Sequence, residues 1–103
     1  MNTTRKIDFG SIVADSPAAG LEVRAFAESD KQLRLLTITK DFVEEDWCVK
    51  DHAGFVVEGE LEIDFDGEVI TYRAGDGLLI QGDSKHKPKA ISEIVKLFLV
   101  EDC

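Results

Sequence analysis

The residues best suited to chemistry in this sequence are its two histidines, His52 and His86, and the cysteine Cys48. Imidazole and thiolate together are donors that suit zinc, and imidazole combined with carboxylate suits other divalent metals such as nickel, iron or manganese. Cys48 has a second interpretation as an attacking thiolate, because a nearby histidine lowers the pKa of a thiol. The structural interpretation treats Cys48 as a small buried apolar residue and the histidines as hydrogen-bonded residues at the rim of a core.

Composition excludes several functions before any fold is considered. The 103 residues include 21 acidic and 12 basic side chains, which gives a formal net charge of −9. A surface of that sign repels phosphate backbones, so we expect no nucleic-acid partner. No apolar stretch is long enough for a signal peptide or a membrane span, which predicts a cytoplasmic protein without a membrane partner. The last residue, Cys103, is interpreted as a free thiol on a mobile tail.

The elements that must position these side chains are predicted to be strands. Short apolar and polar alternations separated by Gly and Asp recur along the chain, and no window has a sustained helical stripe, so the sequence indicates an all-β fold. We expect one domain over residues 1–103, with residues 1–20 as an N-terminal arm and loop and residues 41–51 irregular. The predicted strands are 21–27, 33–39, 55–57, 61–65, 69–73, 78–80 and 94–100.

The strongest local signal is the Asp66-Gly67 pair between two alternating runs. It predicts a two-residue type I′ hairpin turn, which needs positive φ at both positions. The implied register places Phe65 opposite Glu68, Ile63 opposite Ile70 and Leu61 opposite Tyr72 on one apolar face, and Glu62 opposite Thr71 and Glu60 opposite Arg73 on the other.

Counting back through a second two-residue turn at Glu58-Gly59 pairs strand 55–57 with strand 61–65 and places His52 opposite Phe65. Side chains of a strand alternate between its two faces, so His52, Gly54 and Val56 are predicted to face the interior. Because glycine has no side chain, Gly54 is expected to leave space beside His52. The sequence therefore predicts an internal pocket with His52 at its mouth.

The middle of the chain resembles the small members of the cupin superfamily. The resemblance is carried by the order of four segments: Val57-Glu58-Gly59-Glu60-Leu61, then Asp66-Gly67, then Ala74-Gly75-Asp76-Gly77-Leu78-Leu79-Ile80, and then His86. It implies a cupin-type β-barrel, also called a double-stranded jelly roll, with a central pocket and a tendency to form dimers.

The same resemblance bears on metal ligands. It implies that His86 occupies the position of the ligand histidine of the second family motif, whereas His52 stands where the first motif has its glutamate. The two histidine positions of the first motif fall on Asp46 and Cys48, or on Glu45 and Trp47, so the usual ligand set is incomplete. The remaining candidates are His52 and His86, with Cys48, Asp46 or Glu45 beside them.

Other notable residues receive structural interpretations. The aromatic side chains of Trp47, Phe55 and Tyr72 are assigned to packing, since aromatic residues on strands usually serve that role. Phe55 and Val57 face outward in the predicted register, and adjacent exposed apolar groups are uncommon on monomers, which predicts a homodimer. The acidic run 44–46 and the basic run 85–89 are interpreted as solvated loops.

Three functions remain open. The first is a small-molecule-binding domain whose pocket is marked by His52 and His86 and holds a divalent metal. The second is a metal-dependent enzyme, namely a lyase, isomerase or oxygenase acting on a small polar or carboxylated compound, with the metal as Lewis acid. The third is a structural or regulatory dimer without a ligand. Fold alone does not separate them, so whether the protein is an enzyme is left undecided.

Overall fold

The computed structural model describes residues 6–81 and 84–102. The described part contains nine strands and one short 3₁₀ helix, and all strand pairs are antiparallel. The all-β prediction is confirmed. The elements are η1 (Phe9–Ser11), β1 (Asp15–Ala18), β2 (Leu21–Glu28), β3 (Lys31–Thr39), β4 (His52–Glu58), β5 (Glu60–Asp64), β6 (Val69–Arg73), β7 (Gly77–Ile80), β8 (Lys87–Ala90) and β9 (Ile94–Asp102).

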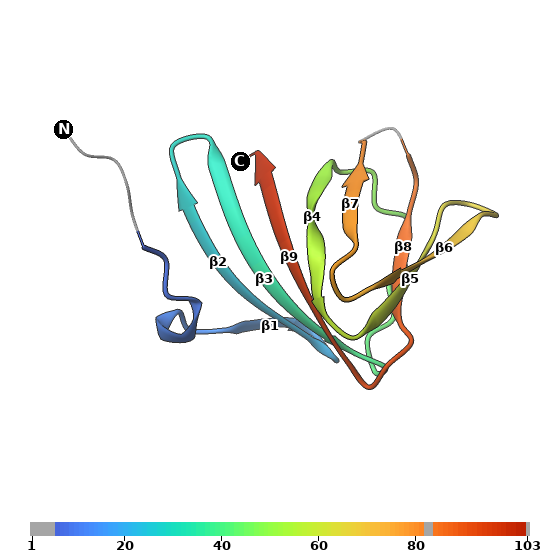
Figure 1. The fold of residues 1–103 in the computed structure, drawn as a ribbon, viewed down its shortest axis with the longest axis horizontal. Helices are drawn as coiled ribbons and strands as arrows, with labels where there is room; N and C mark the ends of the chain where they lie inside the picture. Colours follow the sequence, from blue (N-terminus) through green and yellow to red (C-terminus); the bar gives the residue numbers. More distant parts are fainter. Residues whose placement is uncertain (1–5, 82–83, 103) are drawn as a thin grey trace.

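The strands form two sheets that face each other. The larger sheet has the order β1-β2-β3-β9-β4-β7, and the smaller has the order β6-β5-β8. In Figure 1 the larger sheet curves from the left of the molecule towards the smaller sheet on the right. The two inner faces supply the core, which includes the fully buried Ile38, Val56 and Val95 from one sheet and Leu61 from the other. This architecture is the predicted jelly-roll barrel.

The predicted β5–β6 hairpin is confirmed in every pair. The φ angles of Asp66 and Gly67 are +61° and +111°, as a type I′ turn requires. The N–H of Phe65 donates to the carbonyl of Glu68 at 2.7 Å and closes the turn. The strand register matches the predicted one from Glu60 opposite Arg73 to Ile63 opposite Ile70.

The predicted pairing of β4 with β5 is wrong. β4 lies in the larger sheet, where it pairs with β9 and β7, and β5 lies in the smaller sheet. Gly59, with φ +87°, makes a corner between the sheets instead of a hairpin turn. The predicted inward direction of His52 and Val56 nevertheless holds, because alternation along a strand does not depend on which neighbour the strand pairs with.

The space predicted beside Gly54 is filled by backbone. A Cβ atom at Gly54 would collide with the carbonyl oxygen of Phe98 on the neighbouring strand β9. The glycine therefore allows a close approach of β4 to β9 and does not enlarge the cavity.

Two predicted loops have different outcomes. Residues 14–20, predicted as a loop, contain the short edge strand β1, which pairs with β2. Residues 41–51 contain no strand, as predicted, although Cys48 forms an isolated bridge with His86. Cys103 lies outside the described residues. Within the described part of the chain, no helix has the length and apolar character needed to cross a membrane.

Candidate metal centre

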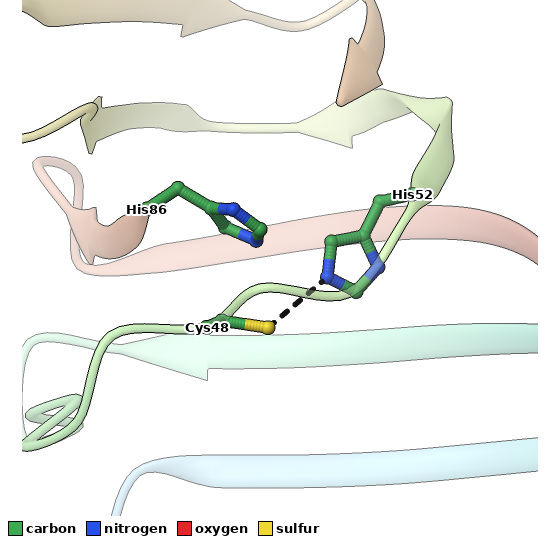
Figure 2. A group of neighbouring side chains, drawn as sticks. All are labelled: Cys48, His52 and His86. Atoms are coloured by element: carbon green, nitrogen blue, oxygen red, sulfur yellow. Dashed lines mark hydrogen bonds between the residues drawn. The ribbon is translucent and has the colours of Figure 1, made fainter. Parts of the chain in front are cut away.

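Cys48, His52 and His86 meet inside the barrel. Their sulfur and one ring nitrogen of each histidine all lie within 4.8 Å of one another. Figure 2 shows the three side chains pointing towards a common point, although they come from the irregular segment, the start of β4 and the residue before β8. The imidazole rings pack edge to face, with their centroids 5.1 Å apart. The structure therefore brings together all three residues that the sequence singled out.

One ring nitrogen of His86 has a hydrogen-bond partner, and the other has none among the described residues. Its side chain is buried, and Nδ1 lies 2.9 Å from the carbonyl oxygen of Ser84. A carbonyl only accepts, so Nδ1 carries a proton, and in the neutral imidazole the lone pair lies on Nε2. Nε2 is buried and has no hydrogen-bond partner among the described residues. A buried polar atom without a partner costs about 1–3 kcal/mol of stability, so a ligand or ion bound to this nitrogen would stabilise the protein.

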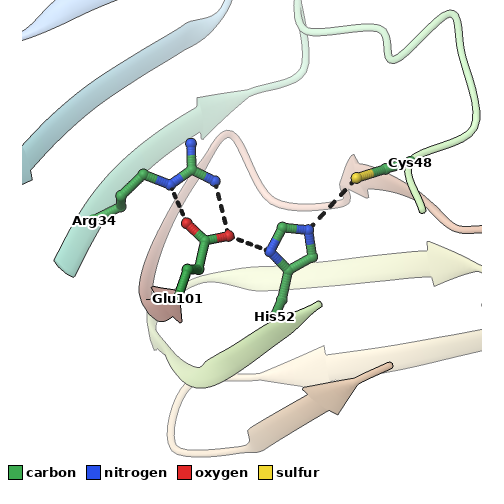
Figure 3. A network of polar contacts seen from close by, with 4 residues as sticks. All are labelled: Arg34, Cys48, His52 and Glu101. Carbon is green, nitrogen blue, oxygen red and sulfur yellow. Dashed lines mark hydrogen bonds and ion pairs between the residues drawn. The ribbon is translucent and has the colours of Figure 1, made fainter. Parts of the chain in front are cut away.

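His52 is held from its other side by an ion pair. Nδ1 of His52 contacts the Glu101 carboxylate, and Glu101 also accepts from Nε and Nη2 of Arg34 at 2.6 and 3.3 Å. This arrangement directs Nε2 of His52 towards Cys48, whose Sγ lies 3.6 Å away (Figure 3). A carboxylate behind a histidine in this manner fixes ring orientation at metal sites.

The electrostatics of Glu101 favour its charged form. Burial acts to raise the pKa of this carboxyl group, but the hydrogen bond with His52 and the positive charge of Arg34 outweigh burial and lower the pKa below the ordinary glutamate value. The carboxylate is therefore ionised at neutral pH and accepts a hydrogen bond from the Nδ1–H of His52, so in the neutral imidazole the lone pair lies on Nε2, the atom that faces Cys48.

The sequence interpretation missed Glu101 and Arg34, although a signal was present. Arg34 shares the phase of the inward-facing Leu36 and Ile38 on β3, and Glu101 shares the phase of Leu99 on β9. A charged residue at an inward position needs a partner, because an isolated buried charge is costly. Two opposite charges at such positions on two strands predict an internal ion pair, here between β3 and the neighbouring β9.

A cavity of about 170 Å³ adjoins the three donors. Its walls are mostly apolar, and its polar lining residues are Arg34, Glu44, Cys48, His52 and His86. Glu45 and Asp46, the alternative candidates beside the histidines, line a separate outer groove and do not reach this cavity. Glu44 lines both spaces, and its carboxylate has no hydrogen-bond or ion-pair partner among the described residues.

The remaining predicted residues lie outside the cavity lining. Tyr72 packs against the core from β6, and Phe55 lies on the outer face of β4 beside Phe98. Trp47 lies at the surface, where the ammonium of Lys87 is 4.7 Å from its ring centroid. Lys87 also donates to the carbonyl of Glu45 at 3.0 Å and so holds the acidic segment in place. Residues 87–89 of the basic run belong to β8, so the prediction of a solvated loop is wrong for this part of the run.

The two facing antiparallel sheets around a central cavity define a jelly-roll β-barrel. Residues 49–101, just over half of the chain, match the family described as Cupin domain, so this chain belongs to the cupin family. A cupin-2 domain containing protein from Shewanella frigidimarina is 33% identical, with a TM-score of 0.65 over 79% of each chain. The prediction drawn from the turn segments is confirmed.

Two further comparisons show more distant likeness. The polyketide synthase CurC of Streptomyces cyaneus is 44% identical over 39 residues, which are 38% of this chain and about a quarter, 25%, of that protein. The structure of FeII HppE has a TM-score of 0.77 at 11% identity and covers 98% of this chain and 60% of that one. At that identity the likeness concerns the fold alone.

Proposed function

We propose that this barrel holds a divalent metal ion on Cys48, His52 and His86, and that the ion and the adjoining cavity bind a small molecule. The observation that carries the proposal is the buried Nε2 of His86, which has no hydrogen-bond partner in the described part of the chain and lies within 4.8 Å of two other donor atoms. A metal would satisfy it. Hydrogen bonds at Nδ1 of both histidines direct the metal-binding lone pairs to the two Nε2 atoms.

The spacing of Cys48 and His52 matches zinc, and His86 lies within 4.8 Å of both donor atoms. Bond lengths of about 2.3 Å to sulfur and about 2.0–2.1 Å to nitrogen, at a tetrahedral angle, separate the two atoms by about 3.6 Å. The Cys48 Sγ to His52 Nε2 separation is 3.6 Å. Three protein donors leave a fourth coordination position for a ligand, which is the pattern of zinc sites that bind small molecules. Iron is the alternative suggested by the fold neighbour FeII HppE, although thiolate favours zinc.

Metal loading tests the proposal. Protein purified without a histidine tag is loaded with Co²⁺ or Zn²⁺ and dialysed, and the expected result is one equivalent of metal by elemental analysis. The cobalt form should have a thiolate-to-cobalt charge-transfer band that Cys48→Ser abolishes and Cys103→Ser, the matched cysteine control, retains. Substoichiometric metal in the wild-type protein would overturn the metal site, and a band that survives Cys48→Ser would remove Cys48 from it.

A second candidate function is metal-dependent proton transfer, as in a lyase or isomerase. The observation that favours it is Glu44, a residue that lines the cavity and whose carboxylate has no partner among the described residues. A carboxylate so placed could serve as a general base, with the metal polarising a carbonyl oxygen when bound.

Deuterium exchange tests this second function without a known substrate. Small 2-oxo acids are incubated with the zinc-loaded protein in D₂O, and loss of the C–H signal next to the carbonyl is followed by NMR. We expect Glu44→Gln to abolish the exchange and Glu45→Gln, the neighbouring charge control, to leave it unchanged. No exchange above the rate in buffer would favour binding without catalysis.

A further inference from the structure

Arg34 faces the same cavity as the proposed metal ligands and retains unused donors. Nε and Nη2 of its guanidinium bond Glu101, whereas Nη1 has no hydrogen-bond partner among the described residues. The side chain is 26% exposed and lines the cavity, so it is accessible to a ligand there. Guanidinium groups recognise carboxylates through several N–H donors at once, and the charge of arginine does not depend on pH in the ordinary range.

The rest of the cavity favours a ligand whose main part is apolar. Its walls include Leu36, Ile38, Ile63, Leu97 and Leu99, which come from both sheets. A cavity of about 170 Å³ is close to the roughly 150 Å³ that holds one benzene molecule in an apolar protein interior. A ligand body of about six carbon atoms therefore fills this space, and longer chains or fused rings would extend out of it.

The charges around the cavity favour a ligand with a single negative charge. Arg34 and the proposed metal ion are both positive, so they disfavour a cationic ligand. Glu44 also lines the cavity, so each further negative charge on a ligand adds repulsion. A monocarboxylate carries one charge and matches the unused donors of the guanidinium.

Building on the proposed metal site, we infer that the ligand is a small apolar monocarboxylate, with its carboxylate on Nη1 of Arg34 and its hydrocarbon body among the leucine and isoleucine side chains. Arg34 then has two tasks. It holds Glu101 behind His52, and it binds the carboxylate of the ligand.

Benzoate and benzamide test the inference, because they share size and shape but differ in charge. In titration calorimetry of the zinc-loaded wild-type protein, we expect benzoate to bind at least about 10-fold more tightly than benzamide, since a hydrogen bond to a charged group contributes about 1.5–3 kcal/mol. Acetate, which leaves the walls unfilled, and 1-naphthoate, which exceeds the cavity, should both bind more weakly than benzoate.

The matched variant is the double substitution Arg34→Met with Glu101→Gln. It removes both charges together, so no unpaired carboxylate is left, and glutamine still accepts from Nδ1 of His52. Zinc is supplied at saturating concentration, because loss of the Glu101 charge behind His52 weakens metal binding. With one equivalent of zinc bound, we expect the preference for benzoate to fall below about 3-fold. Benzoate affinity that is unchanged in this variant would place the carboxylate on the metal and overturn the inference.

Separate readouts distinguish the two proposals. Loss of zinc in the wild-type protein overturns the metal site, whereas bound zinc with equal affinities for benzoate and benzamide overturns only the carboxylate ligand. If the double variant does not fold, NMR of ¹⁵N-arginine-labelled wild-type protein replaces it. Benzoate should shift the guanidinium resonances of Arg34 more than benzamide does, and equal shifts would contradict the inference.

Discussion

The backbones of Cys48 and His86 are paired directly: the N–H of each donates to the carbonyl oxygen of the other at 3.0 Å. This bridge ties the irregular segment 41–51 to the start of β8. Two of the three proposed metal donors therefore have a backbone connection that does not depend on an ion. Because the site is largely preorganised, little ordering free energy opposes metal binding.

Zinc should raise the thermal stability of the protein, because it satisfies the buried Nε2 of His86 and binds only the folded chain. At a free zinc concentration of about 100 times Kd the gain is about 2.7 kcal/mol, which corresponds to a Tm increase of about 10–20 °C for a domain of this size. Differential scanning calorimetry with and without a chelator measures it. Calcium, which prefers oxygen ligands, is the control, and an equal shift with calcium would contradict a thiolate and imidazole site.

Glu101 should make stability depend on pH on the acidic side. Its pKa is lower in the folded state than in the unfolded chain, so the unfolded state binds more protons as pH falls and stability decreases. The contribution of Glu101 is fully present above the ordinary glutamate pKa of about 4.3 and is lost as pH falls through the lower folded value.

Urea unfolding of metal-free protein with chelator, at several pH values, measures this effect. At pH 7 we expect Glu101→Gln to cost about 1–3 kcal/mol, and the difference from wild type should shrink below about pH 4. Glu45→Gln, at an exposed position, is the control and should change little at any pH. A Glu101→Gln difference that stays constant down to pH 2.5 would contradict the assigned pKa direction.

Local signals in the sequence predicted local structure correctly. The Asp66-Gly67 turn fixed the β5–β6 register because a two-residue turn leaves only one pairing of the residues beside it. The same logic failed at Gly59, since a glycine with positive φ can make either a hairpin turn or a corner between sheets. Only the tertiary packing of β4 against β9 decides between these two outcomes.

The candidate site was predicted only in part, because local sequence patterns do not show which strands pair. The phase of β4 placed His52 inside, and the resemblance to cupins placed His86, so the two histidines were identified from the sequence. Glu101 is 49 residues from His52, and no short-range pattern links them. Their contact follows from the pairing of β4 with β9, which brings Ala53 opposite Val100.

The homodimer stays a prediction, and the outer face of the larger sheet is where it can be tested. Phe55 and Val57 are 44% and 45% exposed, and Leu79 of the neighbouring strand β7 is 76% exposed. Burying these side chains in a second copy would remove apolar surface from water. We expect light scattering to give a dimer mass for the wild-type protein and a monomer mass for the double variant Phe55→Ser with Val57→Ser.

The control is Val69→Ser, because Val69 is exposed on the smaller sheet, away from the proposed interface. This variant should stay dimeric. A monomeric wild-type protein would contradict the prediction.

The close approach of β4 to β9 predicts a strong difference between two glycines of adjacent strands. A Cβ at Gly54 would meet the carbonyl of Phe98, a backbone atom that cannot move without shifting β9 and, with it, Glu101. A Cβ at Gly77 on β7 would lie 3.7 Å from the carbonyl oxygen of Gly54, an ordinary contact. Neither glycine has positive φ, so the comparison isolates steric contact from backbone strain.

Gly54→Ala should therefore cost about 3 kcal/mol or more in the free energy of unfolding, whereas Gly77→Ala should change it by less than about 1 kcal/mol. Urea denaturation of both variants measures the difference. Because Glu101 orients His52, the zinc affinity of Gly54→Ala should also fall, and that of Gly77→Ala should not. Equal stability of the two variants would mean that β4 and β9 separate easily at this point. The contact between these strands would then not explain the orientation of His52.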